Sequence, residues 1–267
     1  KIIPLNITTN GEIDFKDFNS KINSKTKLIS LTHMSNVTGA ITDFNEIKNI
    51  LKKYNIPLLV DGCQYVAHKK LDIKSLDPDF YVFSAHKLYG PSGLGILYMK
   101  DKWIESFDPY QGGGSMIKNV DILKSSYLDG FEKFEAGTPS IAEVIGLSAS
   151  IDFVNEVGLD NIFSYEMELH NYAIEKLCHF NNLKIYGNSK NKGSIISFNL
   201  DGFHFNDVSL LLDKKNIALR SGHHCAQPLM KYFNITGNAR ISFGVYNNKN
   251  DIDILIDSLK EIQSMLS

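Results

Sequence analysis

Lys87 follows an apolar run, and its type and position suggest covalent chemistry. The preceding residues, Phe80-Tyr-Val-Phe-Ser84, are typical of a buried strand, and a loop rich in glycine and proline follows at 89–95. A lysine at the end of a buried strand is costly unless it is paired or used covalently. A desolvated amine suits Schiff-base formation, although these residues alone fit a surface lysine equally well.

Cys225 lies in a second informative stretch, Arg220-Ser-Gly-His-His-Cys-Ala-Gln-Pro228. Arg220, His223 and His224 give the thiol a positive surrounding that favours thiolate. Glycine and proline within the stretch indicate a loop, so we expect the thiol to be reachable. Two alternatives stay open. One is an ordinary surface loop. The other is zinc binding. Two observations argue against zinc: adjacent histidines point apart, and no second ligand pair has zinc-finger spacing.

Three further polar residues lie where ligand contacts are expected. Asn36 follows a short predicted strand, Asp61 directly follows the apolar run 57–60, and Arg240 lies inside the apolar stretch 238–243. A buried arginine needs a planar anion, and a substrate carboxylate would serve. The alternatives are a helix N-cap for Asp61 and an internal ion pair for Arg240.

The elements that must position these residues alternate between strand and helix in the first part of the chain. This order predicts an α/β fold with a largely parallel sheet and crossover helices. We expect strands at 1–5, 28–32, 57–60, 80–84 and 93–99, with helices at 14–22 and from Asp43 to about Tyr54.

The rest of the chain has the pattern of a smaller α+β unit. Gly158 separates two predicted helices, so we place a domain boundary there and expect domains at 1–157 and 158–267. The predicted helices are 140–157, 161–180, 206–215 and 249–265, and the predicted strands are 183–186, 194–200, 217–220 and 239–243.

Composition excludes several classes of protein. The net charge of −2 implies no nucleic-acid or membrane partner, and no run is apolar and long enough to span a bilayer. Three cysteines without CxxC spacing argue against a disulfide framework and favour a reducing compartment. We assign Cys63 and Cys178 to packing, and the histidines outside 220–228, apart from His86, to structural or exposed positions.

Four motifs together resemble a known family over nearly the whole chain. They are Ser84-Ala-His-Lys87, Asp61-Gly-Cys-Gln64, Phe134-Glu-Ala-Gly-Thr-Pro139 and Arg220-Ser-Gly-His-His-Cys-Ala. The chain resembles the SufS-type (group II) cysteine desulfurases, which are fold-type I enzymes of the class V aminotransferase group dependent on pyridoxal 5'-phosphate (PLP). The resemblance implies a mainly parallel large-domain sheet of the seven-stranded type plus a smaller α+β C-terminal domain.

The resemblance also implies a role for each site residue. Lys87 would hold PLP as a Schiff base and Asp61 would pair with the pyridinium nitrogen. Gln64 would bond the ring hydroxyl, and Ser84 and His86 would hold the phosphate. Thr138 would reach the phosphate of the PLP bound to the neighbouring subunit. Asn36 and Arg240 would bind the substrate carboxylate. Cys225 would accept sulfur from L-cysteine, and Arg220 would tune the Cys225 loop.

By the same resemblance, the enzyme is a homodimer that leaves a persulfide on Cys225 and passes sulfur to a SufE- or SufU-like acceptor for iron–sulfur assembly. Family members carry an N-terminal section with a phosphate-binding segment and a ring-stacking histidine, which no residue here matches; we expect residues to be missing upstream of Lys1. The compartment is expected to be cytoplasm or a plastid-type organelle. The alternatives are a selenocysteine lyase, another class V lyase or aminotransferase, and an inactive sulfur-transfer scaffold.

Overall fold

The first sheet carries polar residues at one edge because three of its strands are parallel. In this computed structural model, which describes residues 1–265, the strand order is β1-β2-β3-β4. β1, β2 and β3 run parallel, while β4 is antiparallel to β3. The bounds are β1 Ile29–Thr32, β2 Leu58–Asp61, β3 Phe80–Ser84 and β4 Gly95–Met99. The predicted α/β class is confirmed, with four strands of the expected sheet among the described residues.

Short helices precede or connect these strands, and three of them have an aspartate at the N-cap. Asp14, Asp43 and Asp72 each accept a hydrogen bond from backbone amides of the first turn, which satisfies donors that a helix start leaves open. α2 buries Phe44, Ile47 and other apolar residues under the sheet. The bounds are α1 Phe15–Lys21, α2 Phe44–Tyr54, α3 Ile73–Leu76 and the 3₁₀ helix η1 Ala85–Lys87.

The expected strand at 1–5 is wrong. These residues form no strand, and the only pairing near them is an isolated bridge between Ile7 and Ile13. Ile2 and Ile3 are exposed, so the apolar run has no neighbouring strand to complete a ladder. An apolar pentapeptide alone therefore did not suffice to define a strand.

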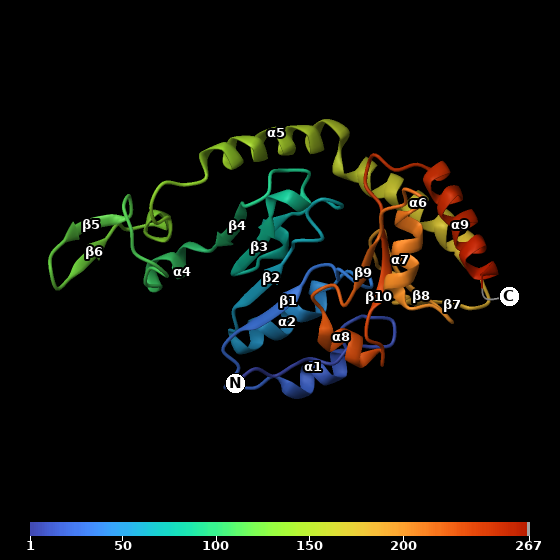
Figure 1. Cartoon of the computed structure of the whole chain (residues 1–267). Helices are drawn as coiled ribbons and strands as arrows, with labels where there is room; N and C mark the ends of the chain where they lie inside the picture. The colour runs from blue at the N-terminus through green and yellow to red at the C-terminus, as the bar shows by residue number, and fades with distance from the viewer. Residues whose placement is uncertain (266–267) are drawn as a thin grey trace.

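A long excursion separates the two halves of the molecule. After α4 the chain forms a hairpin arm, β5 and β6, which projects away from the body, and then returns through η2 to the long helix α5 above the first sheet (Figure 1). α6 follows and lies beside the second sheet (Figure 1). The bounds are α4 Asp101–Ser106, β5 Ile117–Val120, β6 Ser125–Tyr127, η2 Phe131–Phe134, α5 Ile141–Val157 and α6 Leu159–Leu177.

The second sheet is antiparallel throughout, with the order β7-β8-β10-β9. The strand predicted at 217–220 is displaced: the ladder begins only at Arg220, opposite Arg240 on β10. The bounds are β7 Leu183–Tyr186, β8 Ile195–Leu200, α7 Phe205–Asp213, β9 Arg220–Gly222, α8 Gln227–Tyr232, β10 Asn238–Ser242 and α9 Lys249–Ser264.

Each sheet has its own apolar core, and α6 contributes to both. Ile162, near the start of α6, belongs to the cluster around the first sheet, while Leu169, Ala173 and Leu177 belong to the cluster around the second. The domain division at residue 158 stays a prediction. None of the helices within residues 1–265 combines the length and apolarity needed to cross a bilayer.

Candidate active site

The carboxyl edge of the first sheet brings Asp61, Ser84 and Lys87 together. Asp61 is paired with Val82 on the parallel strand β3, so β2 and β3 end at the same edge. η1 follows Ser84 directly and leaves His86 and Lys87 exposed. Among residues 1–265 the Lys87 ammonium has no hydrogen-bond or ion-pair partner, so its amine is available for chemistry.

Cys63 shows how close these groups are. Its Sγ lies 3.9 Å from Ser84 Oγ, and its amide donates to Asp61 Oδ1 at 3.0 Å. Burial raises the pKa of the Cys63 thiol, the Asp61 carboxylate raises it further, and the Lys87 charge lowers it. The thiol assigned to packing from the sequence therefore lies among three candidate site residues.

Asp61 does not begin a helix, although its carboxylate does hold a turn. Oδ1 accepts from the Cys63 amide, and the residues that follow form successive turns. Gly62 is required here because a Cβ at this position would lie 2.0 Å from Tyr81 Oη. The N-cap interpretation is therefore correct in that the carboxylate accepts a hydrogen bond from a backbone amide, and wrong in that turns follow Asp61 where a helix was expected.

The buried side chain of His33 packs against this turn. Its ring stacks on Tyr65 with 3.4 Å between centroids, and Nδ1 lies 3.0 Å from Tyr81 Oη. The His33 amide also donates to the Asp61 carbonyl at 2.7 Å. Burial, helped by the Lys69 charge, lowers the pKa of His33 to about 3, so the imidazole stays neutral.

Gln64 and Thr138 make no hydrogen bond with the other candidate site residues in the described part of the chain. Gln64 is half-buried in the turn after Asp61 and makes no hydrogen bond within the described part of the chain. Thr138 is exposed between η2 and α5, where the neighbouring Gly137 amide donates to Gly114. No interaction among residues 1–265 joins Thr138 to the other candidates.

Cys225 is exposed on a strained loop after β9. Both His224 and Cys225 have left-handed backbone, with φ of 52° and 58°, which costs free energy in residues other than glycine. The Cys225 amide donates to His223 Nδ1 at 3.2 Å, and Arg220 Nη2 lies 3.8 Å from the Cys225 sulfur. Of the three groups expected to surround this thiol with positive charge, the Arg220 guanidinium lies beside it, whereas burial lowers the pKa of His224 and His223 Nδ1 serves as a hydrogen-bond acceptor.

Asn36 connects this loop to the first sheet. Its Nδ2 donates to the His224 carbonyl at 2.7 Å, and its carbonyl accepts from Arg240 Nη1 at 2.8 Å. The buried His224 ring is in turn held through Nε2 by Asn238, 2.8 Å from Oδ1. Sequence reasoning missed Asn238 and the anchoring of His224, since nothing in the local pattern distinguishes a buried histidine from an exposed one.

Arg240 has no acidic partner, which excludes the internal ion pair within residues 1–265. Its Nε is buried without a hydrogen-bond acceptor, and its neighbour across the ladder is another cation, Arg220. Burial and the Arg220 charge lower the pKa of Arg240. Two adjacent guanidiniums, one with an unsatisfied buried N–H, form a site for an anion.

The described residues hold no group of three or more His, Cys, Asp or Glu side chains arranged to bind a metal ion. In particular, His224 Nε2 is taken by Asn238 and His223 Nδ1 by the Cys225 amide. The Cys225 loop therefore gives no support to the zinc alternative.

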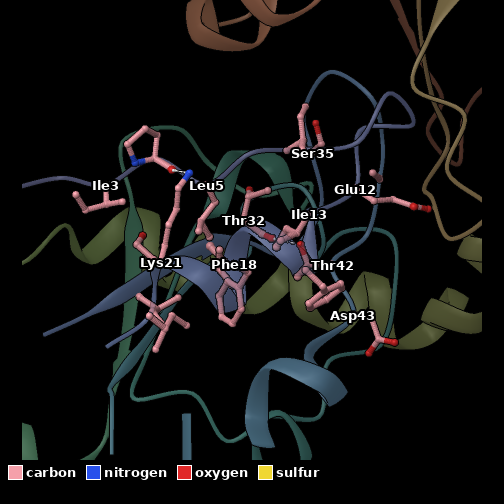
Figure 2. Close-up of a pocket in the computed structure, with 18 of the residues that line it drawn as sticks. Ile3, Leu5, Glu12, Ile13, Phe18, Lys21, Thr32, Ser35, Thr42 and Asp43 are labelled. Atoms are coloured by element: carbon pink, nitrogen blue, oxygen red, sulfur yellow. Dashed lines mark hydrogen bonds between the residues drawn. The ribbon is translucent and has the colours of Figure 1, made fainter. Parts of the chain in front are cut away.

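A separate cavity of about 1420 Å³ runs along β1 between the N-terminal segment and α1. Figure 2 shows apolar Leu5, Ile13 and Phe18 in its wall, with Thr32 and Ser35 nearby. Of the candidate site residues only Asn36 borders it. The cavity is therefore adjacent to the candidate site and distinct from the edge that holds Lys87.

Comparison with known proteins finds relatives that match nearly the whole of this chain. A cysteine desulfurase of Wigglesworthia glossinidia brevipalpis is 42% identical over 268 residues, covering 100% of this chain and 65% of its own length. A probable cysteine desulfurase of Staphylococcus aureus strain Mu50 is also 42% identical, with 64% of its length covered. The crystal structure of the cysteine desulfurase CsdA (S-sulfonic acid) from Escherichia coli superposes with a TM-score of 0.92 at 34% identity, over 98% of this chain and 65% of that one.

The chain spans just under two thirds of the length of these relatives. The model of the family described as aminotransferase class-V matches residues 1–255. Because this match includes both sheets and every candidate site residue, the chain belongs to the class-V aminotransferase family.

Proposed function

We propose that this protein is a PLP-dependent L-cysteine desulfurase that yields L-alanine and a persulfide on Cys225. One observation carries the proposal. An exposed thiol beside the Arg220 guanidinium sits on a loop that Asn36 ties to the sheet edge where Asp61 and Lys87 lie. A nucleophilic sulfur and a free amine are the two groups that this reaction needs from the protein.

PLP is the cofactor of this family, and the residues present fit it. The unpartnered Lys87 amine is available for covalent attachment, and the exposed Asp61 carboxylate would pair with the pyridinium nitrogen. Gln64 would bond the ring hydroxyl, and the phosphate would be held by Ser84 and His86, with Thr138 of the neighbouring subunit. When bound, PLP supplies an electron sink for bonds at the substrate Cα and Cβ.

The chain's own residues then orient the substrate and move its protons. Arg240 and Asn36 would bind the cysteine carboxylate, which would satisfy the buried Arg240 Nε. Lys87 would move the proton at the substrate Cα. The Cys225 thiolate forms an S–S bond with the substrate sulfur while the substrate C–S bond breaks; protonation of the carbon gives alanine.

We further propose the SufS-type subclass and transfer of the persulfide sulfur to a SufE- or SufU-like acceptor for iron–sulfur assembly. The Arg220–Ala226 motif supports the subclass. The exposure of Cys225 and the tether from Asn36 support the transfer step, because an acceptor protein must reach the sulfur while the loop stays in place.

A homodimer is proposed for the same protein. α5 exposes Ile141, Val144 and Ile145 by half or more, and the arm exposes Ile122 and Leu123 almost fully. Apolar surface of this extent on α5 and on the arm that projects from the body is typical of a face that a second copy covers (Figure 1). We expect Ile145→Lys to lower the dimer fraction in analytical ultracentrifugation, whereas Ile254→Lys, on the exposed face of α9, leaves it unchanged.

Borohydride trapping tests the assignment of Lys87. The chain is incubated with PLP, reduced, digested and mapped by mass spectrometry, alongside Lys87→Arg and the same chain extended by the N-terminal section that the family resemblance predicts. We expect a pyridoxyl adduct on the Lys87 peptide and none in the variant. Wild-type chains that stay unlabelled in both lengths refute the cofactor assignment.

Cysteine turnover tests the nucleophile. Cys225→Ala is expected to abolish alanine and sulfide formation from L-cysteine while Lys87 labelling persists; Cys178→Ala, another exposed cysteine, is the control. A Cys225→Ala enzyme that still releases selenide from selenocysteine would favour the selenocysteine lyase alternative. Alanine formation no faster than in Lys87→Ala would favour the inactive scaffold.

A further inference from the structure

Glu166, on α6, is the most deeply buried acidic residue outside the site described above. Its side chain is fully buried, which is costly for a carboxylate unless its oxygens are bonded. Oε2 lies 2.6 Å from His68 Nδ1 and accepts from Ser194 Oγ at 2.9 Å. Oε1 has no hydrogen-bond partner in the described chain. A half-satisfied buried carboxylate calls for a role beyond packing.

Two of these partners belong to segments that carry site residues. His68 closes the run of turns that begins after Asp61, and its amide donates to Tyr65 within that run. Ser194 directly precedes β8, whose Ser197 is paired with Arg240. Glu166 thereby joins the Asp61 turn to the strand beside the anion-binding arginine.

A third segment reaches the same carboxylate. Tyr89 follows Lys87 by two residues, in a left-handed conformation with φ of 57°. Its Oη accepts from the Val245 amide at 3.3 Å, while its own hydroxyl hydrogen has no acceptor with ordinary geometry in the described chain. Burial raises the pKa of Tyr89 to about 12; the Val245 amide lowers it, and the nearby Glu166 charge raises it further. In the described chain, Glu166 Oε1, which lacks a donor, and the Tyr89 hydroxyl, which lacks an acceptor, are therefore neighbours.

We propose that Glu166 is a positioning residue that holds Lys87, through Tyr89, and Asp61, through His68, in fixed relation to the second sheet. The Tyr89 hydroxyl donates to Glu166 Oε1 in the working enzyme. The inference rests on the proposed function, because it gives the role of Lys87 and Asp61 a structural support. Glu166 touches neither substrate nor cofactor; it acts through the two loops.

The geometry explains why a carboxylate is needed at this position. Glu166 must accept from three donors, His68, Ser194 and Tyr89, on two oxygens. The amide oxygen of glutamine can still accept from His68 and Ser194, but an N–H group replaces the second oxygen, so Glu166→Gln leaves the Tyr89 hydroxyl without its acceptor. Aspartate keeps both oxygens on a shorter side chain, so it retains part of the contacts.

The test uses the PLP-loaded enzyme with Glu166→Gln, Glu166→Asp and Tyr89→Phe. The matched control is His170→Gln, which changes a buried polar residue one turn along α6; within the described chain, the side chain of His170 bonds only its neighbour Asn171. We expect Glu166→Gln to lower kcat for L-cysteine by about 10- to 100-fold with KM changed much less, since a misplaced reacting group loses rate before affinity. Borohydride labelling of Lys87 slows in parallel, and Glu166→Asp restores part of both rates.

A double-mutant cycle separates positioning from simple stabilisation. If Glu166 acts through Tyr89, Tyr89→Phe lowers kcat in the wild type and adds little in the Glu166→Gln background. Tyr89→Phe removes one hydroxyl only, so it keeps the test decisive even where Glu166→Gln fails to fold. Full additivity, or a lowered melting temperature with unchanged kcat and Lys87 labelling in both variants, overturns the inference. A wild-type enzyme without label on Lys87 instead refutes the proposed function.

Discussion

Acidification is expected to destabilise the protein through His33. The His33 ring is buried, stacked on Tyr65 and bonded to Tyr81 Oη, and no acidic side chain among residues 1–265 lies at hydrogen-bond distance from it. Its pKa in the folded chain is about 3, compared with 6.5 for an unhindered histidine. Below pH 6.5 the unfolded chain therefore binds a proton at His33, whereas the folded chain binds it only near pH 3.

The magnitude follows from the width of that window. The stabilising contribution is fully present above pH 6.5 and is lost as the pH falls from there towards 3. Each pH unit is worth about 1.4 kcal/mol, so between pH 6.5 and about pH 5 the free energy of unfolding falls by about 2 kcal/mol through His33. His170, with a pKa lowered by burial to about 4, adds a loss of the same sign and similar size over this interval.

Urea unfolding at pH 7 and pH 5 measures this loss in the wild type, His33→Gln and His170→Gln. We expect the wild type to lose about 4 kcal/mol and each variant about 2 kcal/mol, because each variant retains one of the two histidines. His179→Gln removes an exposed histidine and is the control. Equal pH dependence in the wild type and His33→Gln would refute the reasoning, since it would mean that the folded chain binds the proton at His33 after all.

Three further predictions concern single substitutions. Gly62→Ala places a Cβ 2.0 Å from a buried phenol oxygen and is expected to cost about 3 kcal/mol in urea unfolding, whereas Gly95→Ala, with its nearest atom at 3.9 Å, costs less than about 1 kcal/mol. Asp79→Ala is expected to cost about 3 kcal/mol, because Asp79 accepts from a buried backbone amide, an indole N–H and a lysine; a loss below about 1 kcal/mol contradicts this. Arg220→Gln is expected to slow alkylation of Cys225 by iodoacetamide at pH 7, because the variant removes the cation 3.8 Å from the sulfur; Cys178 is the internal control, and an unchanged rate argues against activation by the guanidinium.

The sequence was sufficient to predict most elements whose signals are local. Asp43 begins a helix with apolar residues on one face, and such a pattern needs no partner to be read. Asp61 was correctly expected at the end of a strand, because a buried strand changes composition where it leaves the core. Lys87 was expected at the end of a strand as well, but β3 ends at Ser84 and Lys87 lies exposed at the end of η1. The predicted strand at 1–5 failed because a strand also requires a neighbour, which local sequence does not reveal.

The tertiary structure alone decided which distant residues meet. Asn36 and His224 are 188 positions apart, and only the packing of the two sheets brings an amide donor to that carbonyl. The same holds for Glu166 and His68, whose sequence neighbourhoods give no sign of a buried pair. Residue type and local pattern are encoded within a few positions, whereas contacts across the molecule depend on how whole elements pack. The sequence therefore determined which groups are available for chemistry, and the fold determined that a cysteine, two arginines and an asparagine lie close together.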